Sequence, residues 1–384
     1  MTSYRPRSGG ANAKIQDQRL PPSVRLVPCI ALLHFLLANA QTAATPPANV
    51  LVNAAALSTS SFNPASAETV DLRYRLPRDA TVTVSIYDPD RRLIRILAAN
   101  AKRKQGDNKE RWDGKDLDGR IVPDEAYFFV IEAKDEDGNT AVYDPITFSG
   151  GEFGDVTVGQ VDKGSGTVTY ELSRPSRVLL RAGIAGSVML KTVVDWEPRA
   201  AGTVTEYWNG KDEDGVIDLF ARKHTLVLSY TTLPETNVIT YGNSQYNYRQ
   251  YRASLKAERP MKADRPMANH RRISPHFLQS RLTDRAFKVK IDFPQLRKGE
   301  AVKDRVLVRL DIDPKDRAIL GDQQLEVMLF VDTEFHTEEE RGYLPMNIPL
   351  ELQQLPPGEH VITVNVVTLG DQIGVGSRKI QVGR

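Results

Sequence analysis

Two short segments combine an indole with an acidic or amide side chain and a lysine, a set that could bind a ligand. They are Trp112-Asp113-Gly114-Lys115 and Trp208-Asn209-Gly210-Lys211. An exposed indole stacks on a sugar ring while neighbouring Asp and Asn bond its hydroxyls, so Trp112 and Trp208 are candidate ligand platforms. The structural alternative is a Trp that fills the end of a β-sandwich core, with Asp113 and Asn209 forming the turn beside it.

Three acidic turns offer carboxylates that could bind calcium. They are Asp116-Leu117-Asp118-Gly119, Asp135-Glu136-Asp137-Gly138 and Asp212-Glu213-Asp214-Gly215. A helix–loop–helix calcium loop needs alternating Asp or Asn ligands, a glycine and a late Glu, and no turn matches this pattern. Lys115 and Lys211 fall where ligands would be needed. We therefore predict solvated turns and no metal, with calcium as the alternative.

No residue set predicts an enzyme. The sequence has no Gly-x-Ser-x-Gly motif and no phosphate-binding glycine loop. His336 lies in an acidic stretch, where a solvated loop is favoured over a metal site. The histidines after residue 40 form no close ligand pair; they are His224, His270, His276, His336 and His360. We predict no catalytic residue and no cofactor.

A segment rich in Tyr and Arg, residues 242–284, is the best candidate contact surface. From Arg249 to Arg281 it has nine Lys or Arg against Glu258 and Asp264, a local charge of +7. Arg and Tyr combine charge with planar stacking and are favoured at binding hot spots. The alternative is a flexible charged spacer. The candidate partner-binding residues are Tyr246, Tyr248, Arg249, Tyr251, Arg252, Arg259 and Arg265.

Composition limits the class of protein that presents these residues. The 384 residues are 26% charged and 40% hydrophobic, which is typical of a soluble globular protein with several domains. The formal net charge is only +2, so nothing predicts specific binding of nucleic acid. Any charged partner must therefore meet a local patch.

The N-terminus has the pattern of a secretory signal peptide over residues 1–40. Basic residues precede an apolar run at Ile30–Ala38, and Ala38-Asn39-Ala40 fits a signal-peptidase site. The run is shorter than the roughly 20 residues that a membrane span needs, so we predict no transmembrane segment in the mature chain. Cys29, the only cysteine, would be removed. We expect an extracytoplasmic protein, in the periplasm, on the outer-membrane surface or secreted.

The rest of the chain alternates between strand patterns and linkers. Residues 41–67 are rich in Ala, Thr, Pro and Ser and are predicted to be a disordered linker. From Val70 onward apolar residues recur with a period of two, which indicates short strands. The pattern then repeats 96 residues later: Tyr74 and Leu76 recur as Tyr170 and Leu172, and the Trp112 segment recurs at Trp208.

A repeat of this length predicts tandem whole domains, each an all-β sandwich. We expect immunoglobulin-like or fibronectin-like sandwiches at residues 68–151, 155–241 and 285–384, the last preceded by the basic linker at 242–284. The expected fold class is three tandem sandwiches after a signal peptide.

The motif Trp-Asp/Asn-Gly-Lys-Asp-x-x-Gly, followed by Val122-Pro123 and Tyr127, resembles the immunoglobulin-like domain of the flagellar hook-capping protein (FlgD). That family continues as Val-Pro-x-Gly-x-Tyr, whereas Glu125 occupies the glycine position here. The second copy departs further, with Val216-Ile217-Asp218 and no Tyr. The resemblance implies the fold and a tandem module of secreted bacterial proteins, but it does not transfer an activity.

These observations predict a non-enzymatic structural, adhesive or scaffolding protein. Its expected partner is an envelope or extracellular protein, or an anionic surface polymer. One alternative is a carbohydrate-binding accessory module. Another is a hook-cap-like assembly or capping factor for an extracellular filament, which would self-associate through sandwich edges.

Overall fold

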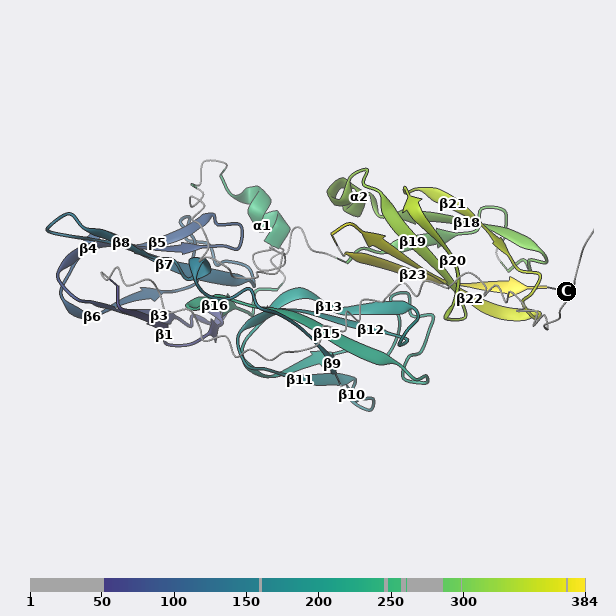
Figure 1. Cartoon of the computed structure of the whole chain (residues 1–384), viewed down its shortest axis with the longest axis horizontal. Helices are drawn as coiled ribbons and strands as arrows, with labels where there is room; N and C mark the ends of the chain where they lie inside the picture. Colours follow the sequence, from purple (N-terminus) through teal and green to yellow (C-terminus); the bar gives the residue numbers. More distant parts are fainter. Residues whose placement is uncertain are drawn as a thin grey trace, which may run out of the picture. The chain divides into compact units, whose positions relative to one another are not determined.

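The computed structural model describes residues 52–158, 161–244, 248–256, 260, 286–297, 299–370 and 372–383. Within these residues nearly every regular element is a β-strand, and the strands form six sheets (Figure 1). The all-β fold class is thereby confirmed. The predicted signal peptide and the first part of the predicted linker, up to residue 51, lie outside the described residues.

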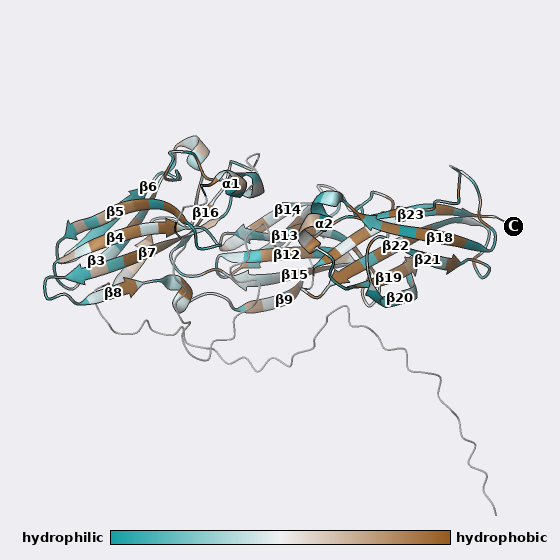
Figure 2. Cartoon of the chain, turned by 90° about the horizontal axis from the view of Figure 1, so that it is seen from above, coloured by the Kyte–Doolittle hydropathy of each residue, from teal (hydrophilic) through white to brown (hydrophobic). Residues whose placement is uncertain are grey.

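Apolar and polar residues alternate along strands such as β3, as the changing colour of its ribbon shows (Figure 2), and the apolar residues of β3 are buried. One sheet has the order β1-β3-β6, with β1 Ala54–Leu57, β3 Val70–Leu76 and β6 Gly106–Trp112. The other has the order β2-β16-β7-β4-β5, and β8 also pairs with β7. Its strands are β2 Ser61–Phe62, β4 Ala80–Tyr87, β5 Leu93–Arg103, β7 Ala126–Asp135, β8 Thr140–Tyr143 and β16 Asn237–Thr240.

Strand β16 reaches the first sandwich from beyond the second one. The sequence placed residues 237–240 in the sandwich predicted at 155–241, whereas the structure pairs Val238 with Tyr127 of β7 and Ile239 with Ser61 of β2. Val238 is fully buried in the first core, which explains the difference. The second sandwich is therefore an insertion between β8 and β16.

A short helix completes the first sandwich. Helix α1 (Tyr248–Ser254) lies in the predicted basic linker, and Tyr248, Tyr251 and Leu255 belong to the same buried cluster as the strands of the first sandwich. No helical pattern was predicted here, because the element is only seven residues long. The segment is mostly polar in composition, so its buried residues Tyr248, Tyr251 and Leu255 were not recognised as one apolar face.

The predicted disordered linker at residues 41–67 also differs from the structure where it is described. It contains β1, β2 and a 3₁₀ helix, η1 (Pro64–Ser66). Phe62 is buried against Trp112, and the Asn63 side chain accepts hydrogen bonds from the backbone N–H groups of Ala65 and Ser66. Backbone pairing of β1 with β3 orders a segment whose composition alone could not.

The second sandwich repeats this arrangement. One sheet has the order β10-β11-β14, with β10 Val161–Asp162, β11 Thr167–Leu172 and β14 Gly202–Tyr207. The other has the order β13-β12-β15-β9, with β9 Phe153–Val158, β12 Ser176–Gly183, β13 Met189–Arg199 and β15 Thr225–Thr232. A 3₁₀ helix, η2 (Pro145–Thr147), precedes β9.

The repeat extends to backbone details. Strands β4 and β5 reappear as β12 and β13 with both bounds displaced by 96 residues, and the register shifts of the two pairs coincide. Asn100 and Trp196 occupy equivalent positions, and both have a φ of +48°. The repeat predicted from side-chain spacing is therefore a repeat of structure.

Two further sheets after residue 285 share one buried cluster and are referred to as the third sandwich. Its sheets have the orders β17-β18-β21 and β20-β19-β22-β23. Helix α2 (Pro314–Leu320) interrupts the strands and is capped at its N-terminus by Asp313, whose side chain accepts from the Lys315 N–H. The strands are β17 Val289–Asp292, β18 Arg305–Ile312, β19 Leu325–Val331, β20 Glu334–Gly342, β21 Met346–Glu351, β22 Gly358–Thr368 and β23 Ile373–Val382.

Candidate functional site

The two candidate tryptophans lie in the sandwich cores. Trp112 is 0% exposed and Trp208 is 4% exposed. Their indole N–H groups donate to the backbone carbonyls of Lys115 and Lys211, at 2.9 and 2.8 Å. Trp112 contacts three aromatic rings edge-on, those of Phe62, Tyr127 and Phe129. In this arrangement neither indole offers its ring face to a sugar, which agrees with the core interpretation of these turns.

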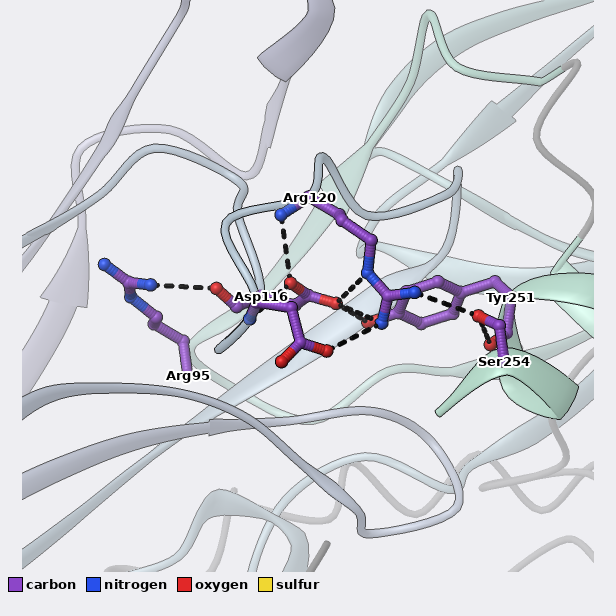
Figure 3. Close-up of polar contacts among 6 residues, drawn as sticks. Arg95, Asp116, Arg120, Tyr251 and Ser254 are labelled. Atoms are coloured by element: carbon purple, nitrogen blue, oxygen red, sulfur yellow. Dashed lines mark hydrogen bonds and ion pairs between the residues drawn. The ribbon is translucent and has the colours of Figure 1, made fainter. Parts of the chain in front are cut away.

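The acidic turn after Trp112 is held by internal contacts. Asp116 is fully buried, and its Oδ1 accepts from the backbone N–H groups of Asp118 and Arg120, at 2.9 and 3.0 Å. Its Oδ2 accepts from Arg120 Nη2 at 3.0 Å and from the Tyr251 hydroxyl at 3.2 Å (Figure 3). Among the described residues, no group of three or more His, Cys, Asp or Glu is arranged to hold a metal ion.

Helix α1 is joined to the same turn. Arg120 Nη1 donates to the Ser254 hydroxyl at 3.1 Å, and the Arg120 guanidinium lies 5.6 Å from the centre of the Tyr251 ring (Figure 3). Arg95 Nη1 donates to the Asp116 carbonyl at 2.8 Å. The strands, the turn and the helix thus share one polar cluster, the Asp116 cluster: Arg95, Asp116, Asp118, Arg120, Tyr251 and Ser254.

Arg252 forms a second contact between α1 and the strands. Its guanidinium lies 2.6 Å from Asp88 Oδ2 and 3.0 Å from Asp90 Oδ2, and its side chain is almost fully buried. Burial raises the pKa of Asp88 to about 6, although the Arg252 charge and a hydrogen bond from the Arg92 N–H oppose this rise. The Asp88-Pro89-Asp90 turn therefore binds an arginine from the segment that was expected to bind a partner.

The other candidate partner-binding residues are only partly described. Tyr248 is buried in the first core together with Tyr251. Arg249 lies in α1, where its backbone alone is described. Tyr246, Arg259 and Arg265 lie outside the described residues. The structure thus brings Tyr248, Tyr251 and Arg252 together inside the first sandwich.

The most buried ion pair among the described residues joins the first two sandwiches. Arg177 Nη2 lies 2.7 Å from Glu125 Oε1, and the two side chains are 1% and 0% exposed. Glu125 Oε1 also accepts from the Ala126 N–H at 2.8 Å, and Arg177 Nη1 donates to the Trp196 carbonyl at 3.1 Å. Arg177 was not predicted to be a functional residue. Glu125 could have been, because it stands where the related motif has glycine.

Strand β16 fixes the backbone beside this pair. The Thr240 N–H donates to the Glu125 carbonyl at 2.9 Å, and the Thr240 hydroxyl accepts from the Glu125 N–H at 3.1 Å. At equivalent positions of the repeat, Ala221 replaces Glu125 and Thr81 replaces Arg177. The first sandwich therefore supplies only Glu125 and the second only Arg177, so the ion pair is specific to the junction between them.

A further buried polar contact joins the second and third sandwiches. Asn365 Nδ2 donates to the Met189 carbonyl at 2.8 Å, and Asn365 Oδ1 accepts from the Met189 N–H at 3.0 Å. The Asn365 side chain thereby bonds both the backbone N–H and the backbone carbonyl of Met189, which lies on β13, an edge strand of its sheet. No pattern in the sequence predicts this contact.

The ring of His360 in the third sandwich faces two acceptors. Its Nδ1 lies 2.5 Å from Asp332 Oδ2, and its Nε2 lies 2.8 Å from the Pro356 carbonyl. Burial lowers the pKa of His360, but the hydrogen bonds to Asp332 and Pro356 outweigh it and raise the pKa above its ordinary value. The pair closes the β19–β20 turn onto β22.

None of the helices in the described part of the chain has the length and apolar character of a membrane span.

Comparison with known proteins agrees with the motif. Residues 59–137 match the family model of the FlgD Ig-like domain, which confirms the resemblance over about a fifth of the chain. The match covers the Trp112 turn and β3 to β7 of the first sandwich. No curated protein matches.

Several solved structures are similar over most of the chain at low identity. The fibronectin(III)-like modules of CbhA from Clostridium thermocellum are 9% identical, cover 86% of this chain and 94% of their own, and give a TM-score of 0.18. A tetra-tandem repeat from the extending region of a large adhesion protein is 13% identical, with coverage of 86% and 75% and a TM-score of 0.18. A bacterial ice-binding adhesin is 12% identical, with coverage of 87% and 99% and a TM-score of 0.20.

Proposed function

We propose that this protein is a non-enzymatic scaffold outside the cytoplasm, which acts by holding binding surfaces in a fixed arrangement on a protein or polymer of the cell envelope. The observation that carries the proposal is the junction between the first two sandwiches. There strand β16 pairs with β7 of the first sandwich, and a fully buried ion pair joins Glu125 to Arg177.

A flexible string of modules needs no such junction. A buried ion pair contributes little net stability, because desolvation of both charges offsets their attraction. Its value lies in specifying one arrangement, since any shift that separates Glu125 from Arg177 leaves two charges buried and unpaired. A junction of this kind suits a protein whose surfaces must be presented together.

The extracytoplasmic location in this proposal rests on the sequence. The leader-like pattern at residues 1–40 predicts export, and the FlgD Ig-like domain that residues 59–137 match resembles a module that also occurs in secreted bacterial proteins. A chain without cysteine after Ala40 has no thiol to oxidise outside the cell.

One observation favours the alternative of a self-associating filament factor. Strand β9 ends the order of its sheet, and Phe153 and Val156 on this strand are 52% and 46% exposed. An edge strand with exposed apolar groups is a template for pairing with a second copy. If β9 pairs copies, light scattering will show concentration-dependent dimers that Val156→Lys abolishes; a monomer at all concentrations removes this alternative.

The test of the scaffold proposal is co-sedimentation of the chain beginning at Gln41 with envelope fragments of the source cells. We expect saturable binding. Pretreatment of the fragments with protease distinguishes a protein partner, whose binding is lost, from a polymer, whose binding persists. A variant with Arg249, Arg259 and Arg265 changed to Ser measures how much of the envelope binding the basic segment contributes. Arg252 is left unchanged because it is paired with Asp88. Absence of saturable binding to both preparations would overturn the proposal.

A further inference from the structure

The outer face of the sheet β10-β11-β14 is a regular array of hydroxyl groups with one exposed aromatic ring. Along β11 the buried Val168, Tyr170 and Leu172 alternate with outward residues, and β14 alternates in the same way. Tyr207 is 80% exposed. The outward residues of the two strands are Thr167, Thr169, Glu171, Thr203, Thr205 and Tyr207.

These side chains form three cross-strand rows. Thr167 lies opposite Tyr207, Thr169 lies opposite Thr205, and Glu171 lies opposite Thr203. Neighbouring strands are about 5 Å apart and alternate residues about 7 Å apart, so the rows make an evenly spaced surface.

Hydrogen bonds within the rows hold the hydroxyl groups in place. The Thr169 and Thr205 hydroxyl oxygens are 3.4 Å apart, and the Thr203 hydroxyl donates to the Glu171 carboxylate. At one end of the array the Ser165 and Thr167 hydroxyl oxygens are 2.8 Å apart. The polar groups of the face are therefore organised before any ligand arrives.

The equivalent rows on β3 and β6 of the first sandwich consist only of charged residues. These three rows, 96 residues earlier, pair Asp71 with Arg111, Arg73 with Lys109, and Arg75 with Asp107. Because the two sheets have the same register, the fold does not require threonines and a tyrosine at these positions. Charged rows are the ordinary solvated surface of such a sandwich, so rows rich in threonine and without Lys or Arg need a separate explanation.

The charges at the ends of the array indicate the kind of partner. Asp162 lies opposite Thr167 at one end, Glu171 lies at the other, and the rows contain no Lys or Arg. The neighbouring Lys163 donates to the Phe220 carbonyl at 2.7 Å. Such a face repels an acidic polymer, whereas the hydroxyl groups of a neutral sugar can donate to the carboxylates and exchange hydrogen bonds with the threonines.

We propose that the outer face of β10-β11-β14 binds a neutral polysaccharide, with a sugar ring stacked on Tyr207 and its hydroxyl groups bonded to the threonine rows. The inference rests on the proposed function, because it names the polymer that one surface of the scaffold contacts. It also moves the sugar platform from the buried Trp208 to its exposed neighbour in the sequence.

Affinity electrophoresis of the chain beginning at Gln41 tests this inference, with dextran, a mixed-linkage β-glucan or hydroxyethyl cellulose in the gel as neutral probes and alginate as the acidic probe. We expect at least one neutral probe to retard the chain, and Tyr207→Ser to weaken that binding about tenfold, equivalent to about 1.4 kcal/mol. The matched control is Arg111→Ser, at the equivalent position of the charged face, which should leave the retardation unchanged.

In the electrophoresis, two results would overturn the inference. One is retardation by alginate alone, or by no probe. The other is equal weakening in Tyr207→Ser and Arg111→Ser, with thermal unfolding of both variants showing that they are folded. Envelope co-sedimentation separates the two proposals: if binding to envelope fragments persists undiminished in Tyr207→Ser, the scaffold proposal stands and the polysaccharide inference fails.

Discussion

Arg177 of the second sandwich places its guanidinium 2.7 Å from the carboxylate of Glu125 in the first, 52 residues away along the chain, with both side chains excluded from solvent. The pair has no counterpart within either repeat, and β16 holds the backbone of Glu125 through Thr240. The position where the related motif has glycine is therefore used to join two domains.

Removing one member of this pair should strongly destabilise the first two sandwiches. Glu125→Ala or Arg177→Ala leaves an uncompensated buried charge, and each should lower the free energy of unfolding by about 3–5 kcal/mol. The double variant Glu125→Leu/Arg177→Met should lose less than either single change, because no charge stays buried. Denaturant unfolding measures all three.

The control for these variants is Arg75→Ala. Arg75 lies 3.8 Å from Asp107, and both side chains are mostly exposed. Its loss should change the free energy of unfolding by no more than about 1 kcal/mol. If Glu125→Ala costs as little as this control, the buried pair does not hold the junction.

Helix α1 should behave as part of the first core. Tyr251→Ala removes a fully buried ring and should destabilise the protein by about 3–5 kcal/mol. Tyr251→Phe removes only the hydroxyl that donates to Asp116 and should cost about 0.5–1.5 kcal/mol. Tyr241→Ala, at a half-exposed ring, should stay within about 0.5 kcal/mol. Equal, small effects of all three in urea unfolding would mean that α1 does not stabilise the sandwich.

Asp88 should make stability fall as the pH rises. Its pKa is raised by burial from 3.8 to about 6, so between these values the folded protein binds more protons than the unfolded chain. The contribution of Asp88 to the free energy of unfolding therefore decreases through this window, by at most about 1.4 kcal/mol per pH unit. Asp88→Asn should remove this component, measured as the difference between the two unfolding profiles from pH 4 to 7. Parallel profiles would contradict it.

The pKa of His360 should be raised, whereas burial alone lowers the pKa of a histidine. Both ring nitrogens face acceptors, the Asp332 carboxylate and the Pro356 carbonyl, so both must carry hydrogen. A raised pKa means that the stability this group contributes is fully present below its unfolded pKa and is lost as the pH rises through its folded pKa. NMR titration should show a His360 pKa above about 6.5 that falls in Asp332→Asn. A value at or below 6.5 would refute this.

The repeat could be predicted from the sequence because it is local. Residues such as Tyr74 and Tyr170 keep the same spacing, so the strands, the bulges and the buried tryptophan turns follow in both copies. Even the contact of Tyr74 with Glu110 recurs as that of Tyr170 with Glu206.

The junction could not be predicted in the same way. A four-residue strand such as β16 carries no signal for which of two similar sandwiches it joins. Tyr251 and Arg252 have the composition of a binding surface, and only the fold shows that their partners, Asp116 and Asp88, lie more than 130 residues earlier in the chain. A sequence shows which side chains are polar, but it does not show which residues they contact in the fold.

The central claim, that the first two sandwiches form one fixed unit through Glu125 and Arg177, is tested most directly by a distance between them. Spin labels at Glu136→Cys and Lys223→Cys, both exposed, can be placed in the chain beginning at Gln41 without competing cysteines. Pulsed electron spin resonance should give one narrow distance distribution, which broadens when Glu125→Ala is added. A broad distribution in the parent chain, or a narrow one that Glu125→Ala leaves unchanged, would contradict the claim.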